Sequence, residues 1–263
     1  MTLMTNHPLA FLGVVLAPFL IAQTSSAAVV VSYAGVSADG DAVSFEADFS
    51  ISGDALTVRL LNTSPFSSAS RDDCLSSFYF DIVRNGLRPT LSYVGAIGDV
   101  WLTSKRLPDT LVTADADLKA VERGDGTWQF KTFNPDPLFD YAFGLGTVGN
   151  SALGPYRFDG DIVGGRGHGP SAGQLPYSIY AGDVTTRSLG NLYLVKDSAT
   201  FTFSGIGGFT EDDIERNCVF GMGTSPSSLV VGHNPEPSAV VGLLGMGAMG
   251  LVATWRKRRR QAA

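Results

Sequence analysis

A histidine and a serine stand together in a pattern that several hydrolases use. Residues 169–173 read Gly-Pro-Ser-Ala-Gly, which fits Gly-x-Ser-x-Gly with Ser171 at its centre, and His168 directly precedes them. A catalytic serine of this kind needs a hydrophobic strand before the turn and a helix after it, with a histidine placed to accept the hydroxyl proton. The flanks at 164–167 and 174–176 carry Gly and Pro and predict an open loop. We interpret the segment as a solvated loop and keep a secreted serine hydrolase using Ser171 and His168 as an alternative.

Two glycine patterns resemble nucleotide-binding loops in spacing alone. Residues 144–149 and 245–250 both fit Gly-x-Gly-x-x-Gly. Neither run leads into the helix of a soluble βαβ unit, whose N-terminus would hold a pyrophosphate. We therefore expect no nucleotide cofactor, and no cofactor of another kind is indicated.

Clustered acidic residues raise the question of a calcium site. The five clusters are Asp39-Gly40-Asp41, Asp72-Asp73, Asn134-Pro135-Asp136, Asp159-Gly160-Asp161 and Glu211-Asp212-Asp213. None has the ligand spacing of an EF-hand loop, and turn formation explains Asp, Asn and Gly equally well. The sequence favours zinc even less than calcium, because Cys and His are few and scattered. We expect no metal, with a structural calcium ion as the alternative.

The chain has two cysteines, Cys74 and Cys218. In an exported protein an oxidising compartment favours their pairing. A disulfide would close a loop of more than a hundred residues and stabilise the fold by roughly 4 to 5 kcal/mol in the chain-entropy model. We predict this disulfide, and two buried free thiols are the alternative.

Several aromatic residues have the chemistry to hold a sugar ring if they lie exposed in a row. They are Trp101, Trp128, Tyr156, Tyr177 and Tyr180. Burial in a core is the commoner fate of such side chains. A carbohydrate-binding module for exopolysaccharide is accordingly an alternative function.

The elements that must position these residues are predicted to be strands. Val43 to Ile51 alternates apolar and polar residues strictly, a turn follows at 52–54, and Leu56 to Leu60 resumes the alternation, so the two runs form an antiparallel hairpin. Further strands are predicted at 77–83, 91–94, 127–133, 140–143, 192–195, 199–204 and 218–222. Short helices are predicted at 115–123 and 210–216, the second capped by Thr210 and Asp213. The sequence therefore predicts an all-β fold, an antiparallel β-sandwich of jelly-roll-like type.

The amino-terminal residues 1–28 have the organisation of a secretory signal peptide. Leu9 to Ala22 is apolar, and Ser26-Ala27-Ala28 supplies the small residues that signal peptidase requires. Cleavage is predicted after Ala28. Residues 29–232 then form one domain, because about 200 residues make one sizeable core and no linker composition interrupts them.

The carboxyl-terminal residues 233–263 combine three features in a fixed order. The first is Pro235-Glu236-Pro237, and the second is the uncharged run Ser238 to Trp255. The third is a basic cluster of Arg256, Lys257, Arg258, Arg259 and Arg260. As a helix the run rises about 27 Å, which is just enough to cross a hydrocarbon core of roughly 30 Å. The five cations hold the C-terminus in the cytosol, because cytoplasmic flanks carry the Lys/Arg excess.

This tail closely resembles the PEP-CTERM sorting signal of exported proteins in Gram-negative bacteria that make exopolysaccharide. Asn234 stands where the commonest pattern has Val. The resemblance implies that exosortase, a membrane-embedded cysteine transpeptidase, recognises Pro235, Glu236 and Pro237 and cleaves near them. It covers about a tenth of the chain and implies no activity for the rest.

The charge balance sets limits on the partners of the exported part. Five of the 19 basic residues lie in the terminal cluster, while all 25 acidic residues precede it, so the remainder has a formal charge of about −11. Nucleic acid binding is not expected, because it needs clustered Lys and Arg. We predict a non-enzymatic structural or adhesive protein of the cell surface or biofilm matrix. Its processing partners are signal peptidase and exosortase, and it passes through an inner-membrane intermediate.

Overall fold

The computed structural model describes residues 28–104, 108–119, 128–135, 140–147, 158, 177–184, 189–223 and 229–232. The strands are β1 Val29–Val36, β2 Ala42–Ser52, β3 Ala55–Asn62, β4 Leu75–Phe80, β5 Ser92–Leu102, β6 Thr110–Asp117, β7 Gln129–Thr132, β8 Phe143–Gly146, β9 Ile179–Tyr180, β10 Tyr193–Ser204, β11 Cys218–Met222 and β12 Leu229–Gly232. The described residues also form the 3₁₀ turns η1 Arg71–Asp73 and η3 Glu211–Asp213. The all-β prediction is confirmed.

The hairpin β2–β3 forms where strict alternation predicts it. Val43, Phe45, Ala47 and Phe49 of β2 are buried, and Phe49 lies opposite Val58 of β3. Gly53 turns the chain with a φ of +62°, which glycine adopts without steric cost. Because the apolar face of this hairpin packs on the core, it fixes the register in which β2 and β3 pair.

The strands form one hydrogen-bonded sheet in the order β1-β2-β3-β10-β9-β4-β11-β12. The hairpin β5–β6 joins it at β10, and β7–β8 joins it at β4. All pairs are antiparallel except β9 with β10, so the sheet is mixed rather than purely antiparallel. The long strand β10 is the junction, because it pairs with β3, β5 and β9.

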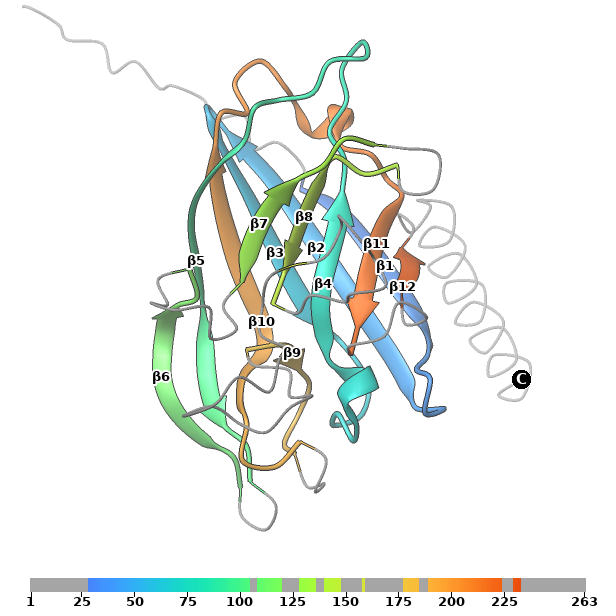
Figure 1. The fold of residues 1–263 in the computed structure, drawn as a ribbon, viewed down its shortest axis with the longest axis vertical. Coiled ribbons are helices and arrows are strands. Elements are labelled where there is room, and N and C mark those ends of the chain that lie inside the picture. The colour runs from blue at the N-terminus through green and yellow to red at the C-terminus, as the bar shows by residue number, and fades with distance from the viewer. Residues whose placement is uncertain are drawn as a thin grey trace, which may run out of the picture.

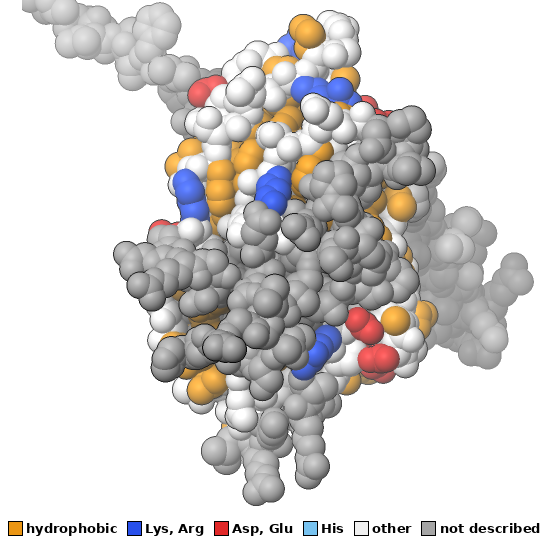
Figure 2. All heavy atoms as spheres, in the orientation of Figure 1, with side chains coloured by type: hydrophobic (Ala, Val, Ile, Leu, Met, Phe, Trp, Pro, Cys, Tyr) orange, Lys and Arg blue, Asp and Glu red, His pale blue; other side chains and the backbone are white. Residues whose placement is uncertain are grey.

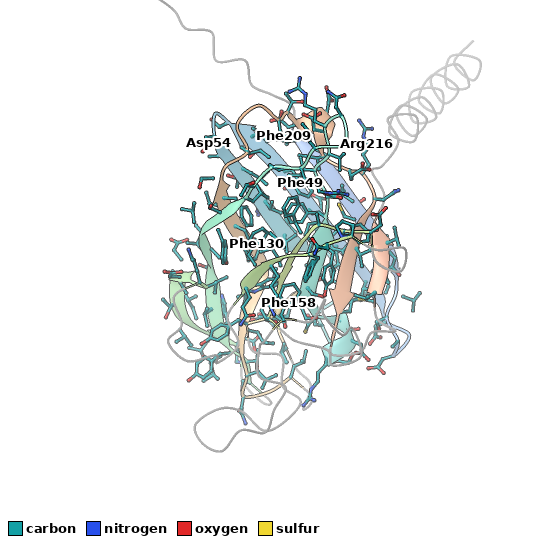
Figure 3. The ribbon with its side chains drawn as sticks, turned by 45° about the horizontal axis from the view of Figure 1, so that its top comes forward. Phe49, Asp54, Phe130, Phe158, Phe209 and Arg216 are labelled. Atoms are coloured by element: carbon teal, nitrogen blue, oxygen red, sulfur yellow. The ribbon has the colours of Figure 1, made fainter. Side chains whose placement is uncertain are left out.

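The sheet folds over so that two layers face each other (Figure 1). β4, β7, β8 and β11 lie in front of β1, β2, β3 and β10 in this view. Phe49 of β2 bridges the layers, with ring centroids 6.0 Å from Phe78 and 5.5 Å from Phe80 of β4. Phe49 and Phe130 both point into the interior (Figure 3). Phenylalanine rings therefore supply much of the core.

Three predictions of local structure are corrected. A helix is predicted at 115–123, but Asp115–Asp117 belongs to strand β6, which pairs with β5. Residues 120–123 of that predicted helix lie outside the described residues. The predicted strands 192–195 and 199–204 are one strand, β10, with a bulge at Lys196 to Ser198. The predicted helix at 210–216 is the single turn η3, in which Asp213 Oδ2 accepts bonds from the main-chain N–H and hydroxyl of Thr210.

Both predicted sorting segments fall largely outside the described residues. Residues 1–27 of the signal and the whole of 233–263 are not described, and this includes Pro235, Glu236, Pro237, the run 238–255 and the cluster 256–260. Ala28 is exposed directly before β1. Within the described ranges, no helix has the length and apolar character of a membrane span.

Candidate functional site

The predicted disulfide is not present, because Cys74 and Cys218 are both free and buried. Cys74 directly precedes Leu75, which pairs with Met222 at one end of the β4–β11 ladder, whereas Cys218 begins β11 at the other end. At about 3.3 Å per residue the two lie roughly 20 Å apart, far beyond the Cα separation of about 7 Å that a disulfide spans. Burial raises the pKa of both thiols, so both are inert at neutral pH.

The acidic clusters that the structure describes serve as turn and cap residues. Asp73 Oδ2 accepts the main-chain N–H groups of Ala69 at 2.9 Å and Ser70 at 2.8 Å. Glu211 Oε1 accepts the N–H of Ile51 at 3.0 Å. Among the described residues no group of three or more His, Cys, Asp or Glu is arranged to hold a metal ion.

The proposed aromatic row does not form an exposed platform. Trp128 and Tyr180 are 1% and 0% exposed, and the Tyr180 hydroxyl donates to Asp109 Oδ2 at 3.0 Å. Trp101 is half-buried beneath Lys196, whose Nζ lies 4.5 Å from the centroid of the indole. Tyr156, like Ser171 and His168, lies outside the described residues.

Tyr177 lines an open cleft beside the β5–β6 hairpin. The cleft has a volume of about 190 Å³. Its lining residues, which we call the Tyr177 cleft, are Val100, Val112, Thr113, Ala116, Asp117, Leu118, Tyr177 and Tyr193. The floor is apolar, since Val100 and Leu118 are buried, while Asp117, Thr113 and the tyrosines add polar groups. Tyr193, at the start of β10, is 42% exposed.

The backbone of Tyr177 adopts a conformation that is rare for an aromatic residue. Its φ is +58°, in the left-handed region. Two hydrogen bonds hold it there: its N–H donates to the Tyr193 carbonyl at 2.8 Å, and its own carbonyl accepts the Trp128 indole N–H at 2.9 Å. Strain of this kind, costing of order 1 to 3 kcal/mol, persists where the surroundings over-determine it and clusters at binding sites.

Trp128, whose indole N–H binds the Tyr177 carbonyl, is held in the core by contacts of its own. Its ring packs edge-on against Phe201, with centroids 5.0 Å apart, and its main-chain N–H donates to Leu118. Leu118 in turn donates to Ala96 of β5. The cleft therefore has a rigid wall that is tied to three separate segments of the sheet.

The carboxylate of the Tyr177 cleft belongs to Asp117, whose Oδ1 accepts the main-chain N–H of Lys119 at 2.9 Å. Asp117 is the ionisable acid in the lining, and Asp115 precedes it on the same strand. Burial, reinforced by the negative charge of Asp117, raises the pKa of the neighbouring Tyr93 phenol. Lys119 donates from Nζ to the carbonyls of Tyr93 at 2.5 Å and Val94 at 3.1 Å.

A second, polar hollow of about 160 Å³ lies over strands β5, β6 and β10 where their ladders are irregular. It is lined by Ile97, Gly98, Asp99, Asp115, Lys196, Ser198 and Thr200. Asp99 Oδ1 accepts the N–H of Asp115 at 2.9 Å, and Lys196 Nζ contacts Asp183 at 2.5 Å. Asp99 thus bonds the main chain of β6, and Lys196 pairs with Asp183 outside the lining, so we attribute the hollow to the β-bulges of these strands.

Of the residues that line the Tyr177 cleft, the sequence pattern indicates Tyr177 alone as a binding candidate. Tyr177 was among the aromatic candidates, whereas Tyr193 and Asp117 were not. Tyr193 falls in a predicted strand, where alternation indicates one face of the sheet. Asp117 lies in a segment that the sequence predicts to be a helix, so no sequence pattern indicates that it lines the cleft.

Comparison with known proteins identifies no relative: no protein-family model, curated protein or solved structure matches this chain. On the face seen in Figure 2, the described Lys and Arg side chains are dispersed among apolar and neutral surface.

Proposed function

We propose that this chain is an exported, non-catalytic protein of the cell surface or extracellular matrix, sorted through a PEP-CTERM tail. Its exported part is a jelly-roll-like β-sandwich, preceded by a signal peptide at 1–28 and followed by a membrane helix at 238–255. The protein is the substrate of a processing reaction and performs none itself.

The way the first and last described strands pack into the sheet supports this proposal. β1 begins at Val29, immediately after Ala28, and β12 ends at Gly232, immediately before the tail. Gly232 is buried, and a Cβ on it would lie 2.4 Å from the Phe220 ring and 3.1 Å from Val31. Both ends of the body are thus anchored in strands, and removal of either terminal segment leaves every described strand intact.

The proposed sequence of events follows from the chemistry of the two termini. Signal peptidase cleaves after Ala28 during export. The run 238–255 then stops in the inner membrane with the cations 256–260 in the cytosol, which places Pro235, Glu236 and Pro237 at the outer membrane–water boundary. Exosortase acts there and releases the β body toward the surface or matrix.

The mass of the protein recovered from the cells that produce it tests both ends together. The expected product lacks the first 28 residues and the residues beyond about 237. Glu236→Ala should leave the amino-terminal cleavage unchanged and retain the tail. A wild-type product with both ends intact, or a reporter after Ala263 located outside the cytosol, would contradict the proposal.

Carbohydrate binding is the second candidate function, and the Tyr177 cleft favours it. An apolar floor edged by a carboxylate, a hydroxyl and two phenols suits a polyhydroxylated ring better than a purely apolar molecule. Retention of the wild-type protein on insoluble neutral polysaccharide tests it, and failure to bind any glycan would count against this function alone.

A further inference from the structure

We propose that strand β12 detaches from β11 before the tail is removed, so that the opening of this one strand controls the rate of processing. The inference rests on the proposed function, because it concerns the same reaction, and it adds a conformational step in the substrate. It depends on the short distance between β12 and the sorting motif, on the pairing of β12 and on the contacts of Gly232.

The sorting motif follows the folded body closely. Gly232 ends β12, and only His233 and Asn234 separate it from Pro235. Three residue steps span at most about 11 Å, even when the chain is fully extended. Backbone that is buried and hydrogen-bonded resists cleavage, and an enzyme that cuts near Pro235 needs several residues before it in an accessible form. Those residues belong to β12.

Strand β12 is short and sits at the end of the ladder. Among the described strands it pairs with β11 alone, through its four residues. Leu229 and Val230 are half-buried and Val231 is 45% exposed, whereas every residue of β11 is buried. A short, partly exposed edge strand opens at a lower free energy than the core strands. Its opening leaves β11 paired with β4.

The last residue of β12 fits because it is glycine. A Cβ at position 232 would overlap the ring of Phe220 and lie 3.1 Å from a methyl group of Val31 on β1. Phe220 packs on Phe45 and Phe78, with ring centroids 6.0 and 4.9 Å apart, so it cannot move aside without disturbing the core. Gly232→Ala should therefore loosen the end of β12 that lies next to the tail.

Pulse labelling of the full-length protein, in the cells that produce it, measures the rate of tail removal. Gly232→Ala is the variant that opens the strand. Gly98→Ala is its matched control, because a Cβ there would lie 2.9 Å from Val195 and so disturbs β5, which does not pair with β12.

A disulfide across β11 and β12 provides the opposite change. Val219 and Val231 lie directly opposite each other, at a Cα separation that a disulfide spans. Val219→Cys with Val231→Cys should therefore lock the strand. Cys74→Ala and Cys218→Ala are included so that no other thiol can pair, and Val231→Cys alone in the same background is the control.

A spacer distinguishes the opening of β12 from a general defect of folding. Six Gly and Ser residues inserted between Gly232 and His233 add up to about 20 Å of reach. With this spacer the enzyme reaches the motif while β12 remains paired. Tail removal from the spacer form should then no longer depend on whether the strand is locked or loosened.

The expected result is that the lock slows tail removal at least tenfold, that Gly232→Ala accelerates it, and that the spacer abolishes both effects. Gly98→Ala and the single-cysteine control should be processed at the rate of their parent proteins. Equal rates for locked and unlocked protein would overturn the inference while leaving the proposed function in place. A lock that slows the spacer form equally would also overturn it. Retention of the tail in every form, the wild type included, would overturn the proposed function and the inference together.

Discussion

The indole N–H of Trp128 donates to the carbonyl of Tyr177 across 49 positions of sequence, at 2.9 Å. Trp128 is buried in the core, whereas Tyr177 lines the open cleft. This one bond therefore couples the packing of the core to the shape of the surface site.

Trp128→Phe should destabilise the protein by about 1 to 3 kcal/mol, because the Tyr177 carbonyl loses its donor while the aromatic packing on Phe201 is largely kept. Urea unfolding measures the change. Trp101→Phe is the control, since Trp101 is half-buried and contacts Lys196 through its ring face. Equal losses for both variants would show that the hydrogen bond does not stabilise the Tyr177 turn.

Strands can be predicted from the sequence where apolar and polar side chains alternate. They are harder to predict where only pairing with a distant strand determines the conformation. Phe45, Ala47 and Phe49 alternate with polar residues, so β2 and its hairpin with β3 follow directly. Strand β6 cannot be predicted in this way, because Ala114, Asp115 and Ala116 have no strand preference. These residues are in a strand only because β6 pairs with β5.

The site was harder to predict than the fold. The polar triplet Lys196-Asp197-Ser198 looks like a break between strands, yet Asp197 forms a bulge with a φ of +61° and β10 continues through it. Likewise, nothing local indicates that Tyr177 has a positive φ. That conformation depends on Trp128 and Tyr193, which lie elsewhere in the sequence.

Arg88→Met should cost about 3 to 5 kcal/mol, because it leaves a buried carboxylate without its cation. Asp81 has a side-chain exposure of 4%, and Arg88 Nη2 lies 2.7 Å from its Oδ2. Lys196→Met is the matched control: its partner Asp183 is 64% exposed, so the expected loss is below about 1 kcal/mol. Chemical denaturation of both variants measures the difference, and similar losses would contradict the role assigned to burial.

The native protein, prepared without reductant, should present no reactive thiol to a disulfide-exchange reagent at pH 8. Cys74 and Cys218 are buried, and the raised pKa of each keeps the reactive thiolate scarce. After denaturation the same sample should release two thiols per chain. No thiols after denaturation would mean that the two cysteines pair in the native protein and that the strand register at β4–β11 is incorrect.

Alkaline pH should unfold the protein partly through Tyr79. Burial raises the pKa of this phenol to about 12 from an ordinary value near 10. Between these values the unfolded chain releases the proton while the folded chain retains it, so the free energy of unfolding falls as pH rises. The slope is up to about 1.4 kcal/mol per pH unit for this group.

Tyr79→Phe removes that slope while keeping a ring between Phe133 and Phe158, whose centroids lie 6.1 and 5.7 Å away. Below pH 9 both forms carry a neutral ring, so any difference in unfolding free energy there measures the lost hydroxyl contacts and should be constant. From pH 10 upward the wild type should lose stability faster than Tyr79→Phe. Parallel curves through pH 12 would mean that the hydroxyl of Tyr79 reaches water in the folded protein, and that the rings of Tyr79, Phe133 and Phe158 pack more loosely than the structure places them.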